Sequence, residues 1–139
     1  MSIWTNVLGV IRFSDEKLID LSKVFIAEDF YYKPIRGCNM PYGTEGSIQW
    51  YAQQEKVEYS GDGYGNEVAI YQRQIVFYGD LRDFEAKDCK IIRKWWSAIP
   101  EKLGQHCWIR DAILNVRPGN GKRFTLTQKN MKDNGHIIN

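Results

Sequence analysis

The sequence has little of what usually marks an enzyme or a membrane protein. It contains 2 His and 3 Cys, with no Cys-x-x-Cys pair, so a zinc site built on a close cysteine pair is not expected. No apolar run approaches the ~18 residues of a membrane span, and no apolar signal segment opens the chain. An odd number of unpaired cysteines is typical of reduced thiols, and we therefore predict a cytoplasmic protein.

The chain also lacks a strong net charge. Its 19 Lys and Arg against 17 Asp and Glu leave a formal charge of +2. Nucleic acid is therefore not an expected partner, because nucleic-acid-binding domains usually carry a clear basic surface. Aromatic residues are abundant at 14%, with 8 Tyr and 5 Trp. A single domain of 139 residues cannot bury all of these rings, so we expect an exposed aromatic surface that contacts a partner.

The apolar pattern alternates between strand and helix periods. Strands are predicted over residues 3–13, 47–59, 68–78, 107–116 and 123–127. Leu18, Leu21 and Phe25 predict a first helix from about residue 14 to 27, and a second helix follows Asp83 and ends at Pro100. On that helix Trp95 and Trp96 point ~100° apart, so one is expected in the core and the other at its margin.

This order of elements is typical of an α+β, ferredoxin-like (split βαβ) fold. We predict an antiparallel sheet with two helices on one face, an open second face and an extra C-terminal hairpin strand. The domain is expected over residues 1–128, with a flexible C-terminal tail over residues 129–139. A long irregular connection from Glu28 to Gly46 precedes the second strand, and loops of this length are often functional.

The connection ends in a glycine-rich bend, Tyr42 to Ser47. A Walker-type phosphate loop needs a lysine and a following helix, and here the lysine is missing and a strand follows. We therefore interpret the bend as a structural hinge first. The alternative is that its backbone amides bind an anion.

Two further groups contain side chains that could take part in catalysis or metal binding. Asp80 and Asp83 flank Arg82, a pattern typical of a helix N-cap with a local ion pair. The alternative is that Asp80, Asp83 and Glu45 hold a divalent metal in a small nucleotide hydrolase or nuclease. His106 precedes Cys107, but a cysteine nucleophile also needs a positioned base and an oxyanion hole. We therefore predict that Cys107 is a buried structural residue.

Three stretches lie in order in the first three-fifths of the chain: residues 3–13 (IWTNVLGVIRF), 41–47 (PYGTEGS) and 78–83 (YGDLRD). Together they resemble a group of short, largely uncharacterised proteins of bacteriophages and prophages. The resemblance implies a phage-encoded protein acting in an infected bacterium, and such small proteins are often inhibitors of antiviral defence. It transfers no catalytic or binding residue to this chain.

We therefore predict a non-enzymatic binding protein without a cofactor, acting as an anti-CRISPR-type blocker or as a sponge for a nucleotide second messenger. Its partner would be a host defence protein or a nucleotide signal, and a homodimer through sheet edges is also expected. An RNA-binding module of ferredoxin-like type is a further alternative, which the missing RNP1-like run disfavours.

A nucleotide sponge needs amides or cations for the phosphate and a ring for the base. The bend would supply the amides, Arg82 or Arg73 the charge, and Trp50 or Tyr51 the stacking face. The predicted ligand-binding residues are Tyr42, Gly43, Thr44, Glu45, Gly46, Ser47, Trp50, Tyr51, Arg73, Asp80 and Arg82.

Overall fold

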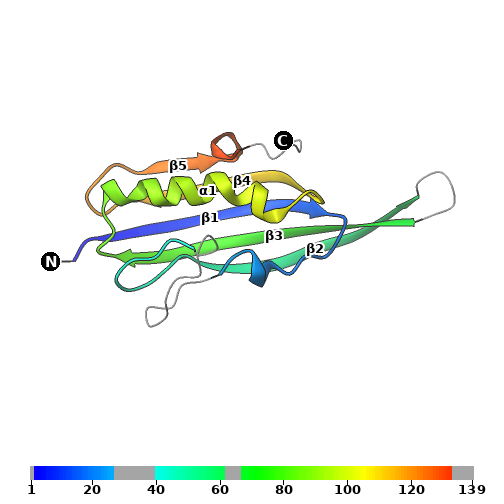
Figure 1. The fold of residues 1–139 in the computed structure, drawn as a ribbon, viewed down its shortest axis with the longest axis horizontal. Helices are drawn as coiled ribbons and strands as arrows, with labels where there is room; N and C mark the ends of the chain where they lie inside the picture. The colour runs from blue at the N-terminus through cyan, green and yellow to red at the C-terminus, as the bar shows by residue number, and fades with distance from the viewer. Residues whose placement is uncertain (1, 27–39, 62–66, 133–139) are drawn as a thin grey trace.

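The computed structural model describes residues 2–26, 40–61 and 67–132, with the backbone alone for residues 55–61 and 67–70. Its strands are β1 (Trp4–Asp15), β2 (Gln49–Gly61), β3 (Glu67–Arg82), β4 (Cys107–Arg117) and β5 (Phe124–Thr127). They form one antiparallel sheet in the order β2-β3-β1-β4-β5, with β1 at its centre (Figure 1). One α-helix, α1 (Cys89–Leu103), lies along one face of this sheet (Figure 1).

The ferredoxin-like prediction is wrong, because that fold places two helices on one face of the sheet. Within the described residues α1 is the only α-helix, and the short 3-10 turn η2 (Ala86–Asp88) leads into it. The first predicted helix is instead the end of β1 followed by another 3-10 turn, η1 (Leu21–Lys23). Leu18 is exposed, whereas Leu21 and Phe25 are buried, so the apparent helical spacing reflects two separate anchors in an irregular segment.

The predicted strands are all present, as are the hairpin of β2 with β3 and the additional strand β5. β3 is longer than predicted, since it passes through Gly79 and Asp80 and ends at Arg82. It breaks at Asp83, which adopts a positive φ of 54°. β1 pairs with β3 along its whole length and with β4 from Asn6 to Asp15, with a bulge between Arg12 and Phe13 in the β4 ladder.

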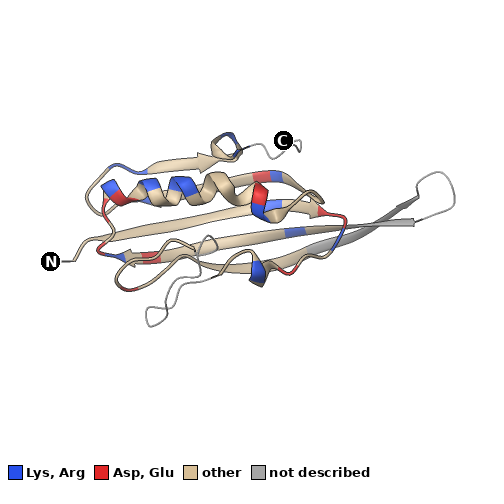
Figure 2. Ribbon diagram, viewed as in Figure 1, with Lys and Arg blue, Asp and Glu red and all other residues tan. Residues whose placement is uncertain are grey.

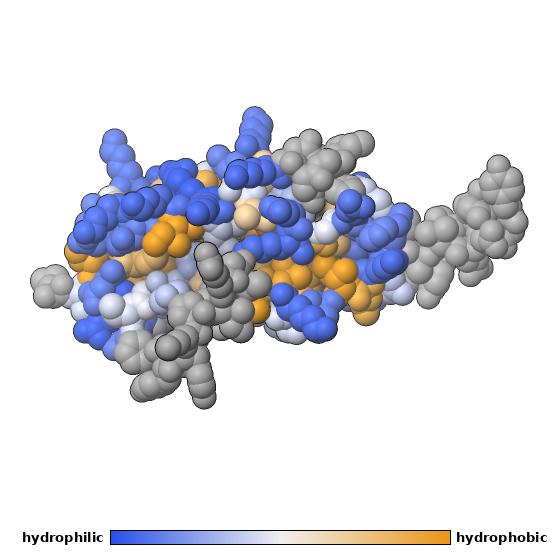
Figure 3. Space-filling view, in the orientation of Figure 1, coloured by the Kyte–Doolittle hydropathy of each residue, from blue (hydrophilic) through white to orange (hydrophobic). Residues whose placement is uncertain are grey.

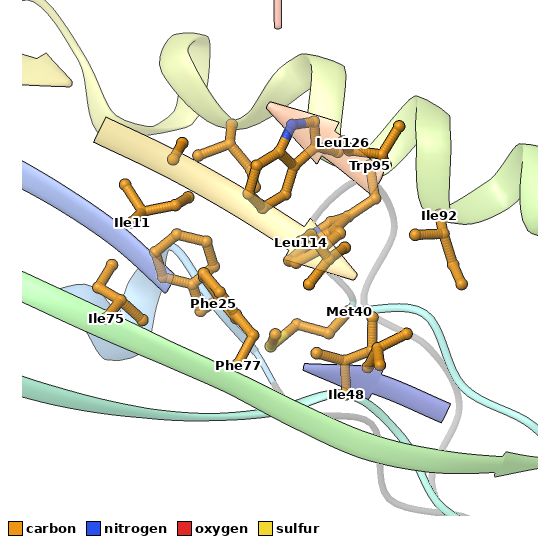
Figure 4. Close-up of a cluster of buried hydrophobic side chains, with 14 of the residues drawn as sticks. Ile11, Phe25, Met40, Ile48, Ile75, Phe77, Ile92, Trp95, Leu114 and Leu126 are labelled. Atoms are coloured by element: carbon orange, nitrogen blue, oxygen red, sulfur yellow. The ribbon is translucent and has the colours of Figure 1, made fainter. Parts of the chain in front are cut away.

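The core lies between the sheet and a layer made of α1 and the described parts of the connection from β1 to β2, residues 16–26 and 40–48. Phe25 and Met40 of that connection are buried with Ile48 against the sheet residues Ile11, Ile75 and Phe77 (Figure 4). The ring of Phe77 lies 5.3 Å from the ring of Phe25 and 5.3 Å from that of Trp95. This contact joins the connection, the sheet and the helix at one residue.

Both tryptophans of α1 are buried, so the expectation that one lies at the core margin is wrong. Trp95 is 6% exposed and Trp96 is fully buried, and the Trp96 indole N–H donates to the carbonyl of Thr127 at 2.9 Å. The part of the sheet that α1 covers extends to β5, so the sides of the helix that carry Trp95 and Trp96 both face the core. The helix also continues through Pro100 to Leu103, where Gly104 ends it with φ 86°. A proline this close to the end removes only one intrahelical hydrogen bond.

The described part of the predicted tail packs on the domain. After β5 the 3-10 turn η3 (Gln128–Asn130) follows, Met131 is buried, and the N–H of Lys132 donates to the carbonyl of Ser97 at 2.9 Å. Residues 27–39, 62–66 and 133–139 lie outside the described part, together with the first part of the predicted Glu28–Gly46 connection and the end of the predicted tail. No helix in the described ranges is long and apolar enough to cross a membrane.

Candidate functional surfaces

The glycine-rich bend is tied by its backbone to the end of β3. The N–H of Gly43 donates to the carbonyl of Gly46 at 2.9 Å, and the N–H of Thr44 donates to the carbonyl of Arg82 at 2.9 Å. In return the N–H of Arg82 donates to the carbonyl of Glu45, also at 2.9 Å. Two of the amides considered for anion binding are therefore used within the protein, which supports the interpretation of the bend as a hinge.

The side chains of the bend form a small ion-pair cluster. The guanidinium of Arg82 binds the carboxylate of Glu45 at 2.5 Å and lies 3.9 Å from that of Asp83. The hydroxyl of Thr44 donates to Asp83 at 2.8 Å. The predicted ion pair is thus present, whereas the N-cap of η2 is Glu85 rather than Asp80 or Asp83.

The acids of the metal alternative serve different partners. Asp80 accepts a hydrogen bond from the side-chain amide of Asn6 at 2.7 Å, while Glu45 and Asp83 flank the Arg82 guanidinium. Within the described ranges no three His, Cys, Asp or Glu side chains are grouped so that they could hold a metal ion. The arrangement of these residues favours ion pairing over metal binding.

The other predicted ligand-binding residues are divided between the two faces of the sheet. Trp50 lies on the face covered by α1, where its indole N–H donates to the carbonyl of Phe25 at 2.6 Å. Arg73 is buried on the same face, about 23 Å along β3 from Asp80. Tyr51 is 62% exposed on the opposite face. The structure therefore brings Tyr42 to Ser47 together with Asp80 and Arg82, but places Trp50 and Arg73 elsewhere.

A shallow depression of about 420 Å³ lies beside the bend on the helix-free face. Gly46, Gln49, Tyr78 and Asp80 are among the residues that line it, and Asp80 is the only one of its lining residues with an ionisable carboxyl or basic side chain. The side-chain amide of Gln49 already donates to Ser47 at 2.7 Å. A carboxylate in this position repels phosphate, so the depression does not suit a nucleotide phosphate.

The helix-free face of the sheet carries an apolar band, defined by the residues Leu8, Val10, Tyr51, Val76, Tyr78 and Ile113. Strand register places Tyr51, Val76, Val10 and Ile113 in one row across the sheet, with Tyr78 and Leu8 in the next row. Leu8 is 55% exposed and Tyr78 is 48% exposed. Of the exposed aromatic surface that the composition predicted, the band contains two rings, Tyr51 and Tyr78, and its other members are aliphatic.

The predictions made from the sequence did not include a second surface, which is basic. Residues 87–132 contain eleven Lys or Arg against three Asp or Glu, a net +8, whereas residues 1–86 contain eight against thirteen, a net −5. Figure 2 shows the basic residues along α1 and at both ends of β5. We call this surface the basic face and define it by the exposed residues Lys87, Lys90, Arg93, Lys94, Lys122, Arg123, Lys129 and Lys132. A running count of charge along the sequence would have found it.

The basic face is held by contacts of its own and is hydrophilic in the space-filling view (Figure 3). The Arg93 guanidinium lies 4.0 Å from the ring centroid of Phe124, which joins α1 to β5 by a cation–π contact. Lys87 pairs with Glu85 at 3.2 Å. Ile91 is 48% exposed on the helix, so one apolar side chain lies among the cations.

The adjacent His106 and Cys107 do not form a catalytic pair. Cys107 is buried, as predicted, and burial raises the pKa of its thiol to about 12. A thiol with this pKa stays protonated at neutral pH and is a poor nucleophile. His106 is exposed, and its Nδ1 lies 3.2 Å from a carboxylate oxygen of Glu16.

No protein-family model, curated protein or solved structure matches this chain. The resemblance to phage proteins therefore rests on the three stretches of sequence, and no residue receives a role from a relative. The surfaces of the molecule have to supply the functional proposal.

Replacing Gly43 with Ala should test whether the bend is a structural hinge. An added Cβ would lie 2.2 Å from the carbonyl oxygen of Arg82, a backbone atom. We expect the free energy of unfolding to fall by about 1–3 kcal/mol, as for other overpacked sites, measured by urea denaturation. Thr44→Ala in the same bend is the control and should cost less. Equal losses for the two variants would contradict the role assigned to this close approach.

Proposed function

We propose that this protein is a non-catalytic binding protein whose basic face occupies an acidic surface of a bacterial antiviral-defence protein. The observation that carries the proposal is the basic face itself, with eight exposed Lys and Arg residues along α1 and at both ends of β5, within a segment, residues 87–132, of net charge +8 against −5 for residues 1–86. A net charge of +2 conceals this separation. Charges gathered on one face steer association with a partner of opposite charge and reject partners of like charge.

The surroundings of the basic face favour a protein partner over nucleic acid. Trp95 and Trp96 are buried, so α1 offers no tryptophan on which bases of a single strand would stack. Ile91 is exposed among Lys87, Lys90 and Lys94. An apolar side chain surrounded by charged ones is typical of protein interfaces, which have an apolar centre and a polar rim.

The state of the candidate catalytic groups supports binding rather than catalysis. Glu45 and Asp83 are engaged with Arg82, and burial keeps the Cys107 thiol protonated. A blocker is also favoured over a nucleotide sponge, because two amides of the bend and the Arg82 guanidinium are already engaged within the protein, and Trp50 and Arg73 lie on the other face of the sheet. The phage-like stretches supply the setting of this proposal, an infected bacterium and its defence system.

Charge reversal on the basic face should weaken partner binding. We expect Lys90→Glu with Lys94→Glu to weaken capture of the partner from a nuclease-treated bacterial lysate by about tenfold, or ~1.4 kcal/mol. Both residues are exposed, so the variant should fold. Lys17→Glu with Lys23→Glu makes the same change of charge outside the basic face and is the matched control. Captured proteins are quantified by mass spectrometry against the wild type.

Two results would overturn the proposal. Capture that is equal for both double variants would show that the basic face is not the binding surface. Capture that nuclease treatment removes would identify nucleic acid as the ligand. Fluorescence anisotropy with a labelled DNA duplex provides the direct check: we expect no binding at physiological salt, whereas phosphate binding would appear as affinity that falls steeply with salt.

A further inference from the structure

We propose that the apolar band is the interface of a symmetric homodimer, in which the helix-free faces of two copies of this chain pack against each other. The proposal concerns a surface other than the basic face and does not depend on the proposed function. It differs from pairing of strand edges, which the sequence suggested as the route to a homodimer. The arrangement of apolar and charged residues about one line across the sheet indicates that a second copy of this chain covers the face.

The line crosses the strands at the level of Gly9, which pairs with Phe77 of β3 and Leu114 of β4. The row on one side contains Leu8 and Tyr78, and the row on the other side contains Val10 and Val76. A two-fold axis along this line exchanges the two rows. It therefore packs Leu8 and Tyr78 of one copy on Val10 and Val76 of the other, apolar on apolar, whereas Asn115 lies opposite Ile113 and Gln49 opposite Tyr51.

The charges on β4 are placed symmetrically about the same line. Arg117 pairs in register with Asn6, and Asp111 pairs with Arg12, so each lies three residues from the level of Gly9. Both side chains are exposed and belong to the same alternating set as Ile113 and Asn115. The two-fold axis therefore places Arg117 of each copy opposite Asp111 of the other. Two ion pairs then flank the apolar centre, which makes the face complementary to itself, as an isologous interface requires.

The size of the face is appropriate for a stable dimer. Strands about 4.8 Å apart with a rise of about 3.3 Å per residue give four strands and ten residues a flat area of about 600 Å². Standard interfaces bury about 800 Å² on each partner. Two such sheets stack at about 10 Å with their strands within about 30° of each other. The angle between the strands of the two sheets displaces Arg117 from Asp111 of the other copy, and the long arginine side chain spans this displacement.

Charge exchange between Arg117 and Asp111 tests this geometry. The wild type is expected to sediment as a dimer in analytical ultracentrifugation. Arg117→Asp and Asp111→Arg should each raise the dimer dissociation constant by about tenfold or more, because each puts like charges opposite one another, and tenfold corresponds to ~1.4 kcal/mol. The double variant Arg117→Asp with Asp111→Arg should dimerise like the wild type.

Mixing the two single variants provides a signature that only this arrangement explains. One copy then carries two acids at these positions and the other two arginines, so the mixture should form a heterodimer as tight as the wild-type dimer. Lys94→Glu, on the basic face, is the control and should leave dimerisation unchanged. A monomeric wild type at every concentration, single variants without effect, or failure of both the double variant and the mixture to restore the dimer would overturn the proposal. A dimer that persists in all variants would indicate edge pairing instead.

Discussion

Replacing Arg73 with Met should lower the free energy of unfolding by about 3–5 kcal/mol, the usual cost of breaking a buried ion pair from one side. The guanidinium Nη2 of Arg73 lies 3.1 Å from a carboxylate oxygen of Asp15, and the Asp15 side chain is fully buried. The same nitrogen donates to the carbonyl of Ile19 at 3.1 Å. Without Arg73 the carboxylate of Asp15 is left in the core without its counter-charge. Urea denaturation of the variant measures the loss.

The double variant Asp15→Leu with Arg73→Met should recover most of this loss. One carboxylate oxygen of Asp15 and the Nε of Arg73 are buried without a hydrogen-bond partner, so the pair does not fully offset the cost of its burial. Apolar replacements of both partners in such pairs are often neutral or stabilising. A double variant as unstable as Arg73→Met would contradict this account of the site.

The carboxyl of Asp15 gives a second readout of the same pair. Burial raises the pKa of Asp15 above its usual 3.8, even though Arg73 beside it acts in the opposite direction and Cys107 lies close to both. From pH 3.8 up to that raised value, the folded protein keeps a proton that the unfolded chain has lost. Stability therefore falls as the pH rises through this window and is constant above it. Asp15→Asn should remove this fall in stability. A variant whose free energy of unfolding depends on pH as in the wild type would contradict this account of Asp15.

The same residue shows why the first part of the fold was mispredicted. Ser14, Asp15 and Glu16 have the composition of a helix start, and Leu18, Leu21 and Phe25 continue the pattern. Asp15 is instead drawn into the sheet by Arg73, 58 positions away. Local propensity is a weak prior that a distant contact of this kind overrides. The strands were predictable because their alternation is set by burial on one face, which the sequence displays directly.

For the candidate sites too, some features could be predicted from the sequence and others could not. The missing lysine was enough to assign the bend as a hinge, and the backbone bonds of Gly43 and Thr44 agree with that assignment. Arg73 and Asp80 are an odd number of positions apart on one strand, so strand parity alone places them on opposite faces. The charge separation was also present in the sequence, but a total of +2 hid it. In the structure Arg117 pairs in register with Asn6, and Asp111 with Arg12. This register depends on how the strands pair and could not be predicted from the sequence.

Phe77→Ala should be as damaging as Arg73→Met, by a different mechanism. Phe77 is fully buried, and its ring makes edge contacts with Phe25 at 5.3 Å, Trp95 at 5.3 Å and Trp96 at 6.5 Å. Truncation of a buried phenylalanine to alanine costs about 3–5 kcal/mol, because a cavity remains where the ring was. The surrounding rings come from two separate segments, the β1–β2 connection and α1, so no single one can move to fill that space.

Phe77→Leu is the matched control, since it keeps an apolar side chain of similar volume and should cost less than about 1.5 kcal/mol. Urea unfolding followed by tryptophan fluorescence reports on the five tryptophans of the chain, of which Trp95 and Trp96 lie on α1, and circular dichroism reports on the sheet. In Phe77→Ala we expect the tryptophan signal to change at lower urea than the sheet signal, because Phe77 holds α1 to the sheet. Similar losses for the alanine and leucine variants would show that the aromatic contacts do not fix the helix. The part of the basic face that lies on α1, Lys90, Arg93 and Lys94, would then need another anchor.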